Sequence, residues 1–250
     1  MQVKQRTIES GDIKELLNFK YPLPIMEHRI FNPFGRNGTG ELISHKAYLK
    51  KQQDNRLKTL KRNTSKLWRL YNCNKNKWKY TDKFMTLTFR TLPSSITEAD
   101  YELKKFIQRL KYFSKSKPEY LGVRELQMEF ERNGIHFHLI IFNMPYIPHS
   151  DLLKLWCKNN PYMDSNKASG VNIMAIKDGY EEMSNYLTSY QLKDIVNNDF
   201  IKGHKTLIRS KGLMIPVKQN YTETIFLPKM EDIKKGLSFL DNKVTYYRLK

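Results

Sequence analysis

Two histidines, His136 and His138, lie two positions apart in a segment where apolar residues occupy the alternate positions. The preceding Asn133-Gly134 pair is typical of a two-residue hairpin turn, because both central residues of such a turn need a positive φ. On a strand, side chains at this spacing point to the same face of the sheet. The two imidazoles are therefore expected to lie close enough to bind one metal ion. A pair of structural histidines with hydrogen-bond partners fits the same pattern.

The strand expected to pair with the histidines carries several glutamates. If Asn133-Gly134 forms the turn, residues 120–131 pair with the histidine strand so that Glu129 lies opposite His138, with Glu125 further along the same face. This register also matches apolar residues with apolar residues on the other face, which favours it. The facing glutamate is either a metal ligand or a plain cross-strand partner. Two imidazoles and one carboxylate suit Mg²⁺ or Mn²⁺ and leave positions open for a substrate oxygen.

Two tyrosines and a lysine form a second candidate group. Tyr186 and Tyr190 share the apolar stripe of a helix predicted over residues 180–193, so both are expected to face the sheet. Tyrosines on such a stripe are more often packing residues than nucleophiles. Lys193 lies one helical turn beyond Tyr190, where its ammonium can stabilise a phenolate or position a phosphate.

The surrounding pattern predicts the elements that hold these groups. Residues 84–89 alternate and are rich in β-formers, which predicts a strand. A helix with Thr97 as N-cap follows, and its apolar stripe is typical of a packing helix. A short helix from Ser150 and a strand over 171–176 precede the tyrosine helix. Residues 1–40, with their prolines and glycines, are expected to form an irregular arm.

Positive charge dominates the composition, because 44 Lys and Arg residues against 25 Asp and Glu give a net charge of +19 over 250 residues. Such an excess favours a polyanionic partner, most often nucleic acid, over an anionic membrane. A helix predicted over residues 41–71 carries basic side chains on the faces outside its apolar stripe. These side chains either contact nucleic-acid phosphates or form an ordinary solvated face.

Several classes of protein are excluded by what the sequence lacks. No apolar run approaches the roughly 18 residues of a membrane span, and the N-terminus has no signal-peptide core. A soluble protein of the host-cell cytoplasm, with no membrane partner, is therefore expected. Cys73 and Cys157 are too few and too far apart for a zinc cluster or a disulfide framework. No Gly-rich Walker loop is present, so the chain is not expected to be an ATP-driven motor.

These motifs together resemble the rolling-circle replication initiators of phages and small plasmids, which belong to the HUH single-strand endonuclease superfamily. Residues 84–89 match the first motif of that family, and His136-Phe137-His138 matches its metal-binding motif. Residues 186–193 are similar to a third motif with a doubled Tyr-x-x-Lys pattern, except that Ser189 replaces the first lysine. The resemblance covers about residues 56–216.

The resemblance implies an α+β fold with a ferredoxin-like antiparallel sheet and packed helices, the HUH endonuclease core, preceded by a basic N-terminal helical region. The expected segments are an arm and basic helix over 1–78, the core over 79–216 and a basic extension over 217–250. The family's third metal ligand matches Glu129, favoured by the register. Glu125 takes that place if the hairpin loop is longer.

The implied activity is nicking of single-stranded origin DNA in the presence of Mg²⁺ or Mn²⁺. Tyr190 is the expected nucleophile because only it keeps a lysine, Lys193, three residues on, and Tyr186 is a second or assisting tyrosine. The products implied are a 5′-phosphotyrosine link and a free 3′-OH for a DNA polymerase, with a separate host helicase to unwind the duplex. The alternatives are a mobilisation relaxase or transposase with the same chemistry, and a non-catalytic basic nucleic-acid-binding protein.

Overall fold

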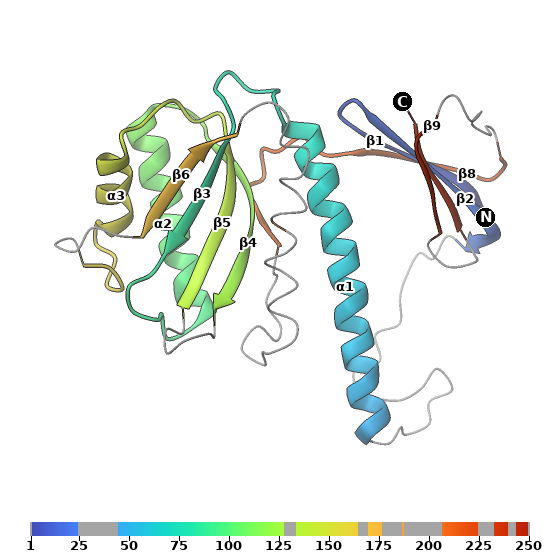
Figure 1. Ribbon diagram of the computed structural model, residues 1–250, viewed down its shortest axis with the longest axis horizontal. Coiled ribbons are helices and arrows are strands. Elements are labelled where there is room, and N and C mark those ends of the chain that lie inside the picture. The colour runs from blue at the N-terminus through green and yellow to red at the C-terminus, as the bar shows by residue number, and fades with distance from the viewer. Residues whose placement is uncertain are drawn as a thin grey trace. The chain divides into compact units, whose positions relative to one another are not determined.

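The computed structural model describes residues 2–24, 45–127, 134–164, 170–176, 187, 207–224, 233–239 and 244–249. Within these ranges the fold is α+β, with three helices and two antiparallel sheets of five strands each (Figure 1). The chain forms two compact units. One comprises Met1–Lys58 and Ile215–Lys250, and the other comprises Thr59–Met214. The α+β class is thus confirmed, while a ferredoxin-like core remains a prediction.

The second unit holds the histidines. Its sheet has the strand order β6-β3-β5-β4-β7, and every neighbouring pair is antiparallel. The elements of this sheet and the helices beside it are β3 (Lys83–Thr88), α2 (Ile96–Ser114), β4 (Glu119–Gln127), β5 (Gly134–Phe142), α3 (His149–Cys157), β6 (Val171–Ala175) and β7 (Leu207–Arg209). The strands predicted from residues 84–89 and 171–176 are therefore present.

One face of this sheet is covered by α2 and α3 (Figure 1). The apolar residues that alternate with the histidines point to this face and pack against the two helices in one core cluster; on β5 they are Ile135, Phe137, Leu139 and Ile141. Phe106 of α2 and Trp156 of α3 are fully buried there. Burial of this many aromatic and aliphatic side chains fixes the helices to the sheet.

The helix α2 begins earlier than its sequence suggests. Ser95, not Thr97, is the N-cap, because its side chain accepts a hydrogen bond from the backbone N–H of Glu98 at 3.2 Å. The Glu98 carboxylate in turn accepts from the backbone N–H of Ser94 at 3.1 Å. Reciprocal bonds of this kind satisfy the free N–H groups of the first helical turn, and this decides where the helix starts.

The opposite face of the same sheet packs against the last turns of α1 (His45–Asn74). Leu67, Leu70 and Tyr71 of this helix are buried in a second core cluster together with Ile140 and Phe142 of β5. The helix predicted over residues 41–71 is therefore present. No helix in the described ranges is both long and apolar enough to cross a membrane.

The first unit is built from the two ends of the chain. Its sheet has the order β8-β1-β2-β10-β9 and contains β1 (Gln2–Ser10), β2 (Ile13–Pro24), β8 (Val217–Tyr221), β9 (Ile233–Phe239) and β10 (Val244–Leu249). The irregular arm expected at the start of the chain is wrong for residues 2–24. Gly11, at φ 63°, opens a tight turn between β1 and β2, a Gly-Asp hairpin signal that the sequence contained. The compact units also have bounds other than the expected 1–78, 79–216 and 217–250.

Candidate active site

The imidazoles of His136 and His138 lie on the same face of the sheet, as predicted. Their ring centroids are 6.3 Å apart and their planes differ by 9°. Phe84 of β3 is stacked on His138 at a centroid distance of 6.2 Å. His138 is buried and His136 is half-buried. The two rings are therefore held parallel, with their edges on one side of the sheet.

Two threonines of β3 hold these rings in place. Thr86 lies opposite His138 and Thr88 opposite His136 in the antiparallel ladder. The Oγ1 of Thr88 is 2.9 Å from Nδ1 of His136, and the Oγ1 of Thr86 is 3.2 Å from Nδ1 of His138. A hydroxyl donates or accepts, so it satisfies Nδ1 in either tautomer. This leaves both Nε2 atoms for other partners.

Sequence reasoning placed these threonines on a strand but gave them no role. The signal was available, because Thr86 and Thr88 have the same spacing of two as the histidines. Residues at equal spacing on paired antiparallel strands face each other pairwise when the strands are in register. Hydrogen bonds to the second ring nitrogen orient metal-binding histidines in many proteins.

Glu125 of β4 supplies a carboxylate on the same face. It lies opposite His136 in the β4–β5 ladder, and its Oε2 is 2.8 Å from Nε2 of His138. Glu125 is 8% exposed and His138 is 4% exposed. A buried carboxylate needs such a partner, because its desolvation is otherwise costly.

The register expected for this hairpin is wrong. The ladder runs to Gln127 opposite Gly134, so residues 128–133 connect the strands and Asn133-Gly134 is not a two-residue turn. Val123, not Glu129, lies opposite His138. Glu129 itself lies outside the described residues. The expected and observed registers differ by an even number of positions, which keeps every side chain on its predicted face.

The environment of His136 favours its neutral form. Burial lowers the pKa of His136 below its usual value, Glu125 opposes this change and His138 adds to it. A neutral imidazole is the form that binds metal ions. The Nε2 atom of His136 makes no hydrogen bond to any described residue.

The donor atoms on this face fit a divalent ion in kind. They are two imidazole nitrogens and one carboxylate, a mixed set that Mn²⁺ and related ions accept. As the side chains stand, no group of three His, Cys, Asp or Glu in the described ranges is arranged to hold a metal ion. The hydrogen bond between Glu125 and His138 joins two of the donor atoms, so an ion would take the place of the proton between them.

The tyrosine group falls largely outside the structure's description. Tyr186, Tyr190 and Lys193 lie outside the described residues. Leu187, from the same predicted stripe, is fully buried in the core cluster of the histidine-bearing face, together with Leu121 and Ile140. The expectation that this stripe faces the sheet is confirmed for Leu187.

Comparison with known proteins links this part of the chain to replication. Residues 82–195 match the model of a family described as replication-associated proteins of the ORF2 type. The match includes the threonines, Glu125, both histidines and both tyrosines. It supports a replication initiator-like protein with a role in replication. No curated protein is significantly similar to the chain in sequence.

One solved structure has a limited similarity. The crystal structure of the hypothetical protein ORF119 from Sulfolobus islandicus rod-shaped virus 1 superposes with a TM-score of 0.34 at 15% sequence identity. The match covers 51% of this chain and 92% of the viral chain. A similarity at this level identifies neither fold nor function.

Proposed function

We propose that this chain is a replication initiator that nicks single-stranded origin DNA at the histidine-bearing face, by the chemistry of HUH endonucleases. One observation carries the proposal. His136 and His138 are stacked on one sheet face, each tied at Nδ1 to a threonine, with the buried carboxylate of Glu125 beside them. All of these residues fall within the segment that matches a replication-associated family.

His136 and His138, through Nε2, and Glu125, through its carboxylate, would hold Mg²⁺ or Mn²⁺. A divalent ion bound there neutralises charge on the scissile phosphate and orients it for in-line attack. The threonines fix the ring orientation, and burial keeps His136 neutral and ready to bind. Glu125 offsets the positive charge of the ion in a region that is largely shielded from water.

Tyr190 is the proposed nucleophile. Its phenolic oxygen attacks phosphorus, the bond from phosphorus to the 3′-oxygen breaks, and the leaving oxygen takes a proton to become a free 3′-OH. The phosphate stays on the tyrosine as a 5′-phosphotyrosine link. A phenol with a pKa near 10 reacts poorly unless its anion is stabilised, and Lys193 would supply that charge. The burial of Leu187 on the histidine-bearing face supports this placement of the tyrosines.

The remaining parts of the chain suit a strand-tracking enzyme. Lys61, Arg62 and Lys66 are exposed on α1, where they can contact DNA phosphates. In rolling-circle replication a host DNA polymerase would extend the free 3′-OH, and a host helicase would unwind the duplex.

The test is covalent capture of DNA. The full chain is incubated with Mn²⁺ and 3′-labelled single-stranded oligonucleotides that tile the replication origin, and is then resolved under denaturing conditions. We expect a labelled protein–DNA adduct that disappears in Tyr190→Phe and in excess chelator, while Tyr146→Phe serves as a matched control. Loss of the adduct in Tyr186→Phe but not in Tyr190→Phe would reverse the two tyrosines. An adduct that forms fully in chelator contradicts the metal role.

A second candidate function is a basic nucleic-acid-binding protein with structural histidines. The hydrogen bond between Glu125 and His138 favours it, because this bond satisfies both buried groups without any ion. The two functions differ in one result. A binder retains single-stranded DNA without forming an adduct on any origin oligonucleotide, and its histidine variants lose stability rather than cleavage.

A further inference from the structure

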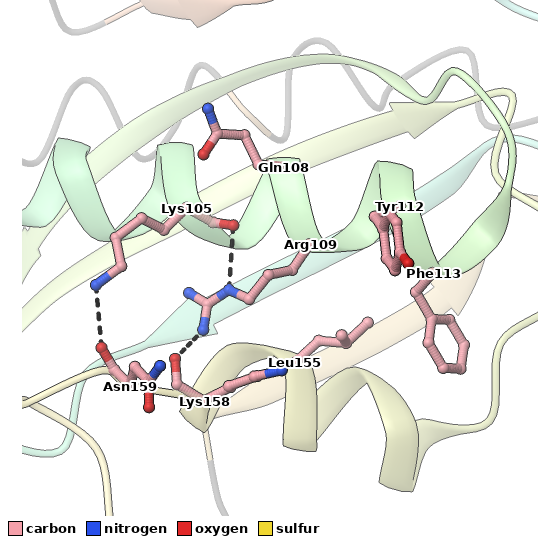
Figure 2. Close-up of a pocket in the computed structure, with 8 residues that line it drawn as sticks. All are labelled: Lys105, Gln108, Arg109, Tyr112, Phe113, Leu155, Lys158 and Asn159. Carbon is pink, nitrogen blue, oxygen red and sulfur yellow. Dashed lines mark hydrogen bonds between the residues drawn. The ribbon is translucent and has the colours of Figure 1, made fainter.

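A groove of about 470 Å³ lies between α2 and α3 (Figure 2). Its size is typical of sites for small ligands. The helices α2 and α3 cover the sheet face opposite the one that carries His136 and His138. The groove is therefore separate from the candidate active site, although both belong to the same compact unit.

Cations line this groove. Lys105, Arg109 and Lys158 contribute to its wall, and none of the described lining residues is acidic. Arg109 bridges the helices, because its Nε donates to the carbonyl oxygen of Lys105 at 3.1 Å and its Nη1 donates to that of Lys158. The Lys105 ammonium lies 3.0 Å from the carboxylate of Glu102, the nearest acid, and 3.0 Å from the carbonyl oxygen of Asn159. Arg109 Nη2 has no hydrogen-bond partner among the described residues.

Aromatic rings flank the cations. Tyr112 is 90% exposed and Phe113 is 48% exposed at the C-terminal end of α2 (Figure 2). Neither ring belongs to the core clusters found among the described residues. Large exposed rings next to cations are the combination with which proteins bind single-stranded nucleic acids, because bases stack on the rings and phosphates face the cations.

We propose that this groove is a second contact site for single-stranded nucleic acid, with a base stacked on Tyr112 or Phe113 and the adjoining phosphate facing Lys158 and Arg109. Charge complementarity selects the ligand class, because a nucleotide supplies both an anion and a planar face. The inference rests on the proposed function, which makes single-stranded DNA the substrate. It adds that the strand also contacts the helix-covered face of the sheet.

Binding of a fluorescent oligothymidylate to the full chain, measured by anisotropy in chelator, tests the groove. We expect Tyr112→Ala to lower the affinity about tenfold. Lys158→Ala should reduce the slope of log affinity against log salt by about 0.7. The matched controls are Tyr146→Ala and Lys154→Ala, since both side chains are highly exposed and lie outside the groove. Both controls should bind like the unmodified chain.

Photocrosslinking with an iodouracil-substituted oligonucleotide gives an independent readout, and the crosslinked peptide should contain Tyr112 or Phe113. Equal affinities for Tyr112→Ala and Tyr146→Ala, with crosslinks only elsewhere, would overturn the proposal. So would a glutamate-rich peptide that binds the chain but not Tyr112→Ala, with oligonucleotide binding unchanged; the groove would then bind a protein. The two proposals fail separately: adduct formation through Tyr190 with no effect of groove variants removes only the groove, and groove binding without an adduct removes only the nuclease.

Discussion

Glu125 and His138 meet across β4 and β5 through a 2.8 Å contact between Oε2 and Nε2, and both side chains are buried. These two atoms are also the ones that would bind a metal ion. A proton and an ion therefore compete for the same position between them. The pair thus decides whether this face is a metal centre or a satisfied structural contact.

Replacing this carboxylate by an amide separates the two roles. Glu125→Gln keeps a hydrogen-bond partner for His138 but removes the charge, so Mn²⁺ affinity should fall at least about tenfold while the melting temperature changes little. Calorimetric titration of Mn²⁺ measures the effect. Glu129→Gln, at the position favoured by the sequence alone, is the comparison and should bind like the unmodified chain. Equal Mn²⁺ affinity in the Glu125 and Glu129 variants would contradict the assignment.

The threonines of β3 are expected to act through the histidines. Thr86→Val and Thr88→Val keep the side-chain shape but remove the oxygen next to Nδ1. Each should weaken Mn²⁺ binding by about 10- to 100-fold and lower the free energy of unfolding by about 1 kcal/mol. Thr86→Ser and Thr88→Ser retain the hydroxyl and should restore most of the binding. If the serine variants bind as poorly as the valine variants, packing rather than ring orientation is responsible.

Asp82 should make stability depend on pH. Burial raises the pKa of this carboxyl from 3.8 to about 6, against the lowering effects of the Asn76 N–H and Lys83. Between these two values the folded state holds the proton more tightly than the unfolded state, so Asp82 stabilises the fold at low pH and this contribution is lost as pH rises through about 6. Asp82→Asn removes the charge and should raise the free energy of unfolding at pH 8 by about 1–3 kcal/mol. Urea unfolding at pH 5 and pH 8 measures this, and an equal effect at both would contradict it.

Asn74 fastens the end of α1 to the segment after β7. Its Oδ1 accepts from the Met214 N–H at 3.0 Å, and its Nδ2 donates to the carbonyl oxygens of Met214 and Leu70 at 2.9 and 2.8 Å. Asn74 is fully buried, so Asn74→Ala leaves backbone groups without partners and should cost about 2–4 kcal/mol. Chemical denaturation measures the loss. Ser65→Ala, an exposed change on the same helix, should cost far less.

Local patterns predicted much of the histidine-bearing unit. The strands at residues 84–89 and 171–176, the helix α2 and the basic helix α1 were all predictable, because alternation and helical periodicity are properties of neighbouring residues. The terminal sheet was not predicted. In it β1 pairs with β8 and β2 pairs with β10, and such pairings join segments from opposite ends of the chain. No window of local sequence contains that information.

The sequence by itself determined which side chains share a face: His136 and His138 on one side, and Ile135, Phe137 and Leu139 on the other. Only the tertiary structure decided which carboxylate meets them. Sliding one strand by an even number of residues keeps the alternation intact, so the hydrophobic pattern is equally satisfied by several registers. The longer connection and the pairing of β4 with β7 accompany the register that brings Glu125, rather than Glu129, to the histidines.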